Sequence, residues 1–143
     1  NIVAAIGRGQ LKVLDQRVQA RREIFRRYEA ALSGIEGISF MPEMASGRAN
    51  RWLTVMLVDP VVCGVGVMEI IKALESENIE SRPVWKPMHR QPLFAGCQYF
   101  THGEEESVSD RLFEQGICLP SGSSLSQADQ ERVIRIIKQM VKG

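Results

Sequence analysis

One short stretch, IESRPVWKPMHRQPLF at residues 79–94, gathers side chains that suit a binding site. Trp85 offers an apolar face on which a sugar or a base can stack, Lys86 a point charge for a phosphate, and His89 a group that donates or accepts a proton near neutral pH. Prolines on both sides of Lys86 restrict the backbone, which lowers the entropy lost when a ligand orders the segment. The combination suits a phosphorylated or nucleotide-linked substrate. A rigid connector whose Trp85 packs on a neighbouring helix accounts for the same residues equally well.

Two other places are weaker candidates for ligand contacts. In PSGSSLS, at residues 120–126, small residues with free backbone amides precede a helix and can receive an anion. The same residues are common in turns and helix caps, and capping is the favoured interpretation. Asn50 and Arg51 lie where the first expected strand begins and could face a site, although Arg51 also suits the covering of a strand edge.

The sequence does not indicate self-contained catalysis or a metal site. It contains no G-x-G-x-x-G, P-loop, H-E-x-x-H, G-x-S-x-G or D-x-D-type calcium loop. His89 and His102 are too far apart in sequence to be presented by one helix, so we expect no metal ligand set. The cysteines, Cys63, Cys97 and Cys118, are odd in number and widely spaced. They indicate neither a disulfide framework nor zinc, and a reducing cytoplasm fits best.

The net charge of the chain does not indicate a class of binding partner. The formal net charge is +1, so no overall attraction to nucleic acid or to an acidic membrane is implied. The arginine-rich stretch DQRVQARREIFRRYEAAL, at residues 15–32, is interpreted as an exposed basic face, because acidic residues are interspersed and aromatics for base stacking are few. Nucleic-acid binding by this stretch is the less favoured alternative. No apolar run approaches the length that a membrane helix needs.

A small domain must position the candidate binding residues named above. With 143 residues, 44% hydrophobic and 24% charged, the chain suits one compact domain with a core. The apolar periodicity, the helix-capping residues and the positions of glycine and proline predict three short strands covered by helices, which is an α/β fold. Pro83 confines the second strand to an edge. The expected helices are 2–33, 67–78, 107–115 and 127–142, the expected strands are 51–58, 79–85 and 117–119, and 34–49 is a loop with a short extended piece at 38–40.

The order and spacing of four stretches resemble one known family. NIVAAIGRGQLKVLDQRVQARREIFRRYEAAL, NRWLTVML, NIESRPVWKPMHRQPLF and GICLPSGSSLS together look like the C-terminal part of the sugar aminotransferases of the DegT/DnrJ/EryC1/StrS family. The resemblance covers essentially the whole chain. SRPVWKPMH further resembles the subgroup that aminates a UDP-linked 4-keto-6-deoxy-N-acetylhexosamine on the route to bacillosamine-type sugars.

The resemblance implies the small C-terminal domain of a fold-type I aminotransferase, with residues 1–33 as a connecting helix and 34–143 as the substrate-side domain. In that family pyridoxal phosphate and its Schiff-base lysine belong to a larger N-terminal domain, so no lysine of this chain is assigned a catalytic role. The complete enzyme is expected to be a cytoplasmic homodimer that passes an amino group, usually from glutamate, to the sugar ketone. This chain, which opens without methionine inside an expected helix, is interpreted as an inactive fragment of it.

The residues carried over from the family are those of the small domain. Trp85, Lys86 and His89 match the loop that approaches the nucleotide sugar, with Met88 as apolar lining, and Asn50 and Arg51 match the segment that enters the first strand. The stretch CGVGVMEII departs from relatives, which tend to begin this helix with more polar residues. The alternative function is a non-catalytic regulatory or oligomerisation module of the same family.

Overall fold

A four-stranded antiparallel sheet forms the centre of the computed structural model, which describes residues 1–101, 103 and 107–141. The strand order is β1-β2-β4-β3. Strand β2 pairs with β1 and with β4, and the register sets Met56 opposite both Phe40 and Ile117. The strands are β1 (Ile38–Phe40), β2 (Thr54–Val58), β3 (Arg82–Pro83) and β4 (Gly116–Leu119).

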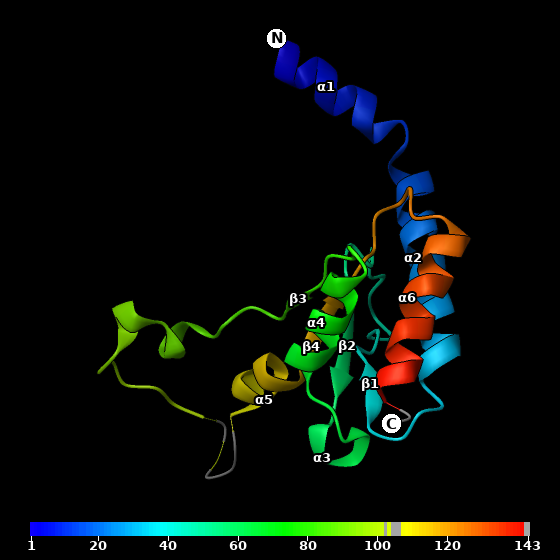
Figure 1. Cartoon of the computed structure of the whole chain (residues 1–143). Helices are drawn as coiled ribbons and strands as arrows, with labels where there is room; N and C mark the ends of the chain where they lie inside the picture. The colour runs from blue at the N-terminus through cyan, green and yellow to red at the C-terminus, as the bar shows by residue number, and fades with distance from the viewer. Residues whose placement is uncertain (102, 104–106, 142–143) are drawn as a thin grey trace.

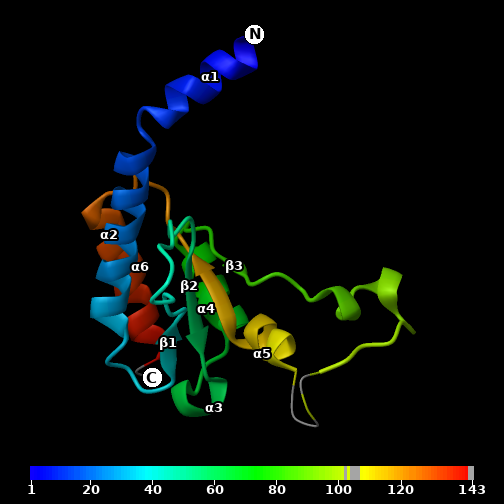
Figure 2. The same ribbon diagram turned by 180° about the vertical axis from the view of Figure 1, so that it is seen from behind.

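The helices occupy both faces of this sheet (Figures 1 and 2). Helices α2, α4 and α6 join the strands in one hydrophobic core, while α5 contacts β2 and β4 from the other face. The helices are α1 (Ile2–Leu11), α2 (Leu14–Leu32), α3 (Pro60–Cys63), α4 (Val67–Ser76), α5 (Val108–Gln115) and α6 (Gln127–Met140), and two single 3₁₀ turns are η1 (Met88–Arg90) and η2 (Pro92–Phe94).

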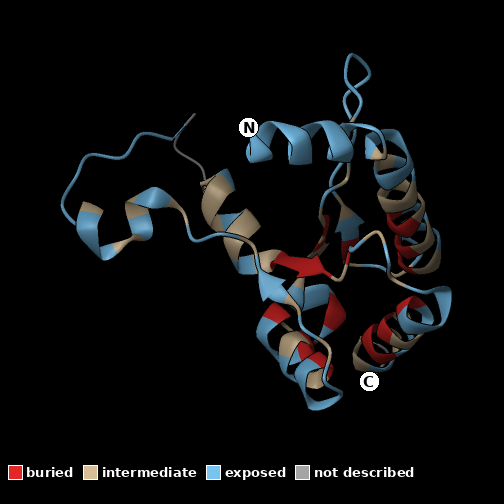
Figure 3. Ribbon diagram, turned by 90° about the horizontal axis from the view of Figure 1, so that it is seen from above, coloured by how far each residue is buried: buried red, intermediate tan, exposed pale blue. Residues whose placement is uncertain are grey.

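Alternation along β2 shows how the sheet defines the core. Thr54, Met56 and Val58 are fully buried on one face, and the residues between them are only half-buried on the other. The helices complete the core with apolar residues at spacings of three and four, as α4 does with Val67, Ile70 and Leu74. Figure 3 shows the buried residues on the strands and on the helix faces that meet them, whereas α1 is exposed along its length. The fold is therefore α/β, as predicted.

The N-terminal third differs from the single long helix that the sequence predicts. The chain forms two helices, and the break falls at Lys12 and Val13, while Gly7 and Gly9 lie within α1. Helix α1 buries no residue and projects beyond the domain (Figure 1). The prediction was wrong because apolar spacing continues through residues 2–32, and neither glycine nor proline marks the break.

The sheet has one strand more than predicted, and two strands are shorter. The extended piece at 38–40 pairs with β2 as a full strand, because Gly37 adopts φ +85° and lets the chain pass close to α3; a Cβ there would lie 2.7 Å from Cys63 Sγ. Strand β2 begins at Thr54 rather than at 51. The strand expected from Ile79 reduces to Arg82–Pro83, and it lies at the sheet edge as Pro83 required.

Several helix boundaries follow the predicted capping chemistry. Ser107 and Ser126 accept hydrogen bonds from the backbone N–H groups of Asp110 and Asp129, so α5 and α6 begin where expected. Asn78 takes the left-handed conformation, at φ +58°, just after α4. The start of α4, in the stretch that departs from relatives, is fixed by Glu69, whose carboxylate accepts from the N–H of Gly66 at 2.8 Å.

Candidate functional site

The stretch from 84 to 101, here called the arm, leaves the sheet after β3 and extends away from the domain (Figures 1 and 2). The arm carries four of the predicted contact residues, Trp85, Lys86, Met88 and His89. All but His89 have more than a third of their surface exposed. The structure thus places these four side chains on one projecting segment that contacts the domain at only a few points.

Trp85 is held at the base of the arm by a second tryptophan. Its ring stacks on that of Trp52 with 5.9 Å between centroids and 25° between planes. Trp85 is 62% exposed and Trp52 is 57% exposed, so the pair is oriented without being covered. Each ring keeps surface on which a planar or sugar ring can stack. The sequence interpretation missed Trp52, although an aromatic beside the predicted contact residues Asn50 and Arg51 was the signal that could have found it.

Asn50 and Arg51 have different surroundings. Asn50 is exposed and accepts a hydrogen bond from the Trp52 N–H at 3.2 Å, so it lies close to the tryptophan pair. The Arg51 side chain has only 10% of its surface exposed. Its guanidinium lies 3.7 Å from the centroid of the Phe25 ring and donates to the Met41 carbonyl at 2.8 Å. The structure does not bring Arg51 together with the arm residues.

Glu43 anchors the segment of residues 43–51 to helix α2. It accepts from Arg22 at 2.7 Å and from the N–H of Ala49 at 2.7 Å, and it lies 3.8 Å from Arg51. The hydrogen bond from Arg22, aided by the one from Ala49, lowers the pKa of Glu43 to about 2. The carboxylate is therefore ionised at all physiological pH values, and it fixes residues 43–51 against α2.

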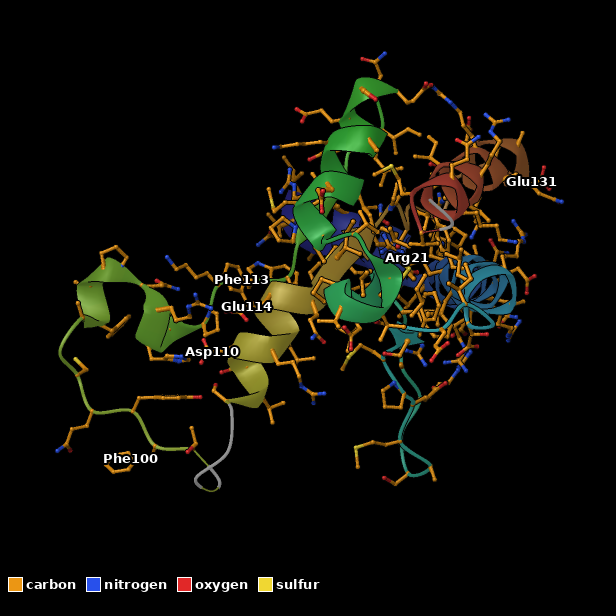
Figure 4. All side chains as sticks on the ribbon, turned by 60° about the horizontal axis from the view of Figure 1, so that its bottom comes forward. Arg21, Phe100, Asp110, Phe113, Glu114 and Glu131 are labelled. Atoms are coloured by element: carbon orange, nitrogen blue, oxygen red, sulfur yellow. The ribbon has the colours of Figure 1, made fainter. Side chains whose placement is uncertain are left out.

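His89 lies at the second contact between the arm and the domain. Its Nε2 lies 2.9 and 3.0 Å from the two carboxylate oxygens of Asp110 on α5. Tyr99 stacks on the imidazole at 3.7 Å between ring centroids. Beside it, Arg90 donates to Glu114 at 2.7 Å and lies 5.4 Å from the Phe113 ring centroid. Figure 4 shows Asp110, Phe113 and Glu114 on α5 near this part of the arm.

Lys86 and Met88 complete the arm. The side chain of Lys86 is exposed, and its backbone carbonyl accepts from Gln91 Nε2 at 3.4 Å. The same amide lies 3.7 Å from the sulfur of Met88, which is 60% exposed. A charge, a thioether and one tryptophan of the stacked pair thus lie within a few residues along the arm. Such a surface suits a ligand that has both an apolar ring and an anionic group.

A groove of about 740 Å³ lies on the other side of Trp52. The first turns of α2, the end of α1 and the loop after β4 form its walls, and Arg17 crosses it to donate to Ser123 at 3.1 Å. Arg21 donates to the carbonyl of Trp52 and so fixes the backbone beneath the tryptophan pair. The groove is lined by Gly7, Gln10, Leu11, Leu14, Arg17, Val18, Arg21, Asn50, Trp52 and Ser123.

The PSGSSLS segment supports the capping interpretation. Ser126 caps α6, as predicted, and Ser121 is buried. The Ser121 hydroxyl donates to the Leu119 carbonyl at 2.7 Å and accepts from the Thr54 N–H at 2.8 Å. These serines therefore close the ends of strands and helices, which is a structural role.

The arginines of α2 serve mainly as donors within the protein. Arg22 pairs with Glu43, Arg26 with Glu23 at 2.8 Å, and Arg27 donates to Gln130 at 3.3 Å. With Arg17 and Arg21, all five arginines of the stretch have protein acceptors. The predicted exposed basic face is therefore wrong in part, because Arg21, Arg22 and Arg27 are only partly exposed and donate to residues that are distant in the sequence.

Pyridoxal phosphate, the cofactor that the resemblance implies, requires particular side chains in its pocket. Such a pocket needs a lysine near the cofactor's aldehyde and a carboxylate near its ring nitrogen. Within residues 1–101, 103 and 107–141, Lys12, Lys72 and Lys86 are exposed, and none of the lysines makes a hydrogen bond or ion pair with a carboxylate. Over the same residues, His, Cys, Asp and Glu form no cluster of three that could hold a metal ion, and no helix is long and apolar enough to cross a membrane.

Comparison with solved structures defines the class of protein to which this fold belongs. The aminotransferase TlmJ from Streptoalloteichus hindustanus superposes with a TM-score of 0.78 at 26% identity, over 97% of this chain and 36% of that one. DesI, solved in the presence of its TDP-sugar product, has the same fold with a TM-score of 0.84 at 18% identity, over 96% of this chain and 34% of that one. The fold is that of one part of an aminotransferase.

The family model for DegT/DnrJ/EryC1/StrS aminotransferases matches residues 1–138, and the chain belongs to this family. The resemblance seen in the sequence is confirmed at that level. EpsN of Bacillus subtilis (strain 168), named provisionally as a pyridoxal phosphate-dependent aminotransferase, is 48% identical over 137 residues, which cover 96% of this chain and 34% of EpsN. The GDP-perosamine synthase of Caulobacter vibrioides (strain ATCC 19089 / CIP 103742 / CB 15) is 33% identical over an alignment of 147 positions, which covers 99% of this chain and 37% of the synthase. The chain spans about a third of the length of these relatives.

Proposed function

We propose that this chain is the small, C-terminal, substrate-side domain of a pyridoxal phosphate-dependent aminotransferase that acts on a nucleotide-linked 4-keto-6-deoxy sugar. The amino donor in this proposal is glutamate, and the product serves cell-surface polysaccharide or glycan synthesis. Family membership supports the reaction class. The names of relatives support a sugar substrate, since a GDP-perosamine synthase is 33% identical over almost the whole chain.

The observation that carries the proposal is the exposed, oriented tryptophan pair beside a charged arm. Trp52 and Trp85 are stacked and more than half exposed, and Lys86 follows directly. A nucleotide sugar has a base and a sugar ring that stack on such faces, and a diphosphate that attracts a lysine ammonium. His89 is the hydrogen-bonding group of this proposed surface, Met88 is its apolar lining, and Asn50 supports it through Trp52.

In this proposal the described residues bind and orient the sugar nucleotide, and the rest of the protein holds the cofactor. This division is carried over from the family to which the chain belongs, and it agrees with the chain's spanning about a third of the length of its relatives. The complete enzyme is proposed to be a cytoplasmic homodimer, and the isolated 143-residue chain is proposed to be inactive.

Steady-state kinetics of the full-length protein test the proposal. The assay follows glutamate-dependent amination of a UDP-4-keto-6-deoxy-N-acetylhexosamine, with Trp85→Ala and Lys86→Ala compared with Lys72→Ala as a control for an exposed lysine on α4. Loss of one stacking partner is worth about 1–3 kcal/mol, so KM for the sugar nucleotide should rise at least about fivefold in Trp85→Ala. Unchanged KM in both arm variants, or no amination of any nucleotide-linked ketosugar, would refute it.

The second candidate is a non-catalytic oligomerisation or regulatory module. It is favoured by α1 and the first residue of α2, where five apolar side chains are at least half exposed. A surface of this kind indicates association. Light scattering of the full-length protein, made alongside the kinetic assay, separates the two: a dimer with transaminase activity supports the enzyme, and a dimer without it supports the module. The five residues are Ile2, Val3, Ile6, Leu11 and Leu14.

A further inference from the structure

The His89 side chain is held by contacts on one ring nitrogen and one ring face. Nε2 meets the Asp110 carboxylate at 2.9 and 3.0 Å, and Tyr99 stacks 3.7 Å from the ring. Among the described residues, no hydrogen bond to Nδ1 is found. The imidazole of His89 has 20% of its surface exposed, and the Asp110 carboxyl 23%. The ring is thus largely enclosed while one of its two nitrogens has no partner in the described part of the chain.

Asp110 is itself fixed by the first turn of α5. Its backbone N–H donates to the hydroxyl of Ser107, which caps the helix. The Tyr99 hydroxyl lies 2.7 Å from the same Ser107 oxygen and 3.1 Å from that of Ser109. One hydroxyl cluster therefore holds both the residue that stacks on His89 and the residue that pairs with it. This shared anchoring limits rotation of the imidazole.

The charge of Asp110 determines which nitrogen of His89 carries a proton. Burial raises the pKa of Asp110, but hydrogen bonds with Ser107 and His89, together with the nearby charges, outweigh it and hold the pKa below its ordinary value. The carboxylate is therefore ionised near neutral pH and can only accept. A nitrogen at 2.9 Å from it must donate, so the proton of neutral His89 lies on Nε2 and Nδ1 is an acceptor.

We propose that Asp110 is a positioning residue that keeps the His89 proton on Nε2 and thereby presents Nδ1 as a hydrogen-bond acceptor for a hydroxyl group of the sugar nucleotide. The inference rests on the proposed function, because it assigns a ligand group to the same surface. It adds a residue on α5 that the sequence pattern around the arm does not contain. In this proposal Tyr99, which stacks on the His89 imidazole, holds the plane of that ring.

The test combines a tautomer measurement with kinetics on the full-length protein. The ¹⁵N chemical shifts of labelled histidine report which ring nitrogen is protonated, and the signals lost in His89→Gln identify this residue. Asp110→Ala should convert His89 from the Nε2–H form to a mixture of both forms. KM for the sugar nucleotide should rise roughly fivefold, as expected for one lost hydrogen bond, with a smaller rise in Asp110→Glu.

Glu114→Gln is the matched control. Glu114 lies on the same helix and also anchors the arm, through Arg90, but it does not contact His89. The control should leave the tautomer and KM unchanged, which separates orientation of the imidazole from general anchoring of the arm.

The outcomes are distinguishable. If His89→Gln raises KM but Asp110→Ala changes neither KM nor tautomer, the positioning role is overturned and the proposed function stands. If Asp110→Ala and Glu114→Gln raise KM equally without a tautomer change, Asp110 merely anchors the arm and the proposal fails. If His89→Gln leaves KM unchanged while Trp85→Ala raises it, the assignment of His89 fails alone. Absence of any amination overturns both proposals.

Discussion

Ser121→Ala should destabilise the chain although the substitution removes a single oxygen. Ser121 is 5% exposed and joins the loop after β4 to the first residue of β2. Its hydroxyl accepts from the Thr54 N–H at 2.8 Å and donates to the Leu119 carbonyl at 2.7 Å. Alanine removes both contacts and adds no polar group. The side chain is too deeply buried for water to replace the hydroxyl without rearrangement of the loop.

The magnitude follows from the group that loses its partner. Thr54 is 0% exposed, so its N–H would be left buried and unpaired, at a cost of about 1–3 kcal/mol. The Leu119 carbonyl also loses a donor. We therefore expect the free energy of unfolding to fall by about 2 kcal/mol, a large part of the stability of a domain of this size.

Urea unfolding of the 143-residue chain, followed by circular dichroism, measures this difference. Ser124→Ala is the matched control, because Ser124 is exposed in the same loop, and it should change the free energy of unfolding by less than about 0.5 kcal/mol. Equal midpoints for Ser121→Ala and Ser124→Ala, with the same slope against urea, would refute the structural role assigned to Ser121.

Three further predictions concern charge, aromatic contact and thiol exposure. The folded-state pKa of Glu43 lies at about 2, below its ordinary value of 4.5, so the contribution of Glu43 to stability is present above pH 4.5 and is lost as pH falls toward 2. Glu43→Gln should therefore flatten the dependence of unfolding on pH between 4.5 and 2. An unchanged acid unfolding curve would contradict this prediction. The stacked Trp52 and Trp85 should give a coupled near-ultraviolet dichroism signal that disappears in Trp85→Phe and in Trp52→Phe alike; if each variant merely halves the signal, the rings do not stack in solution. Cys97 is exposed, whereas burial raises the pKa of both Cys63 and Cys118. One thiol should therefore react rapidly with a thiol reagent, and Cys97→Ser should abolish that rapid phase. Rapid reaction of two thiols would show that the core is open.

The sequence determined the features that depend on local chemistry. Caps at Ser107 and Ser126, the edge position imposed by Pro83, and the apolar spacing of α4 and α6 are fixed by residues close to one another in the chain. The family was recognisable for a related reason, because the order and spacing of short stretches are preserved over residues 1–138. The exposed arm with Trp85, Lys86 and Met88 could also be located, since prolines and mixed side chains interrupt the regular pattern there.

Contacts between residues that are distant in the sequence depend on the packing of the fold. Trp52 and Trp85 are 33 positions apart in the numbering, and His89 and Asp110 are separated by 21. No periodicity joins such pairs, because their contact depends on how β2, β4 and α5 pack. The break after α1 and the pairing of β1 with β2 were also not evident from the sequence, since α1 buries no residue and a three-residue extended piece does not indicate which strand it pairs with. The types of side chain at the proposed site could thus be identified from the sequence, while the contact partners, orientation and protonation of those side chains depend on the fold.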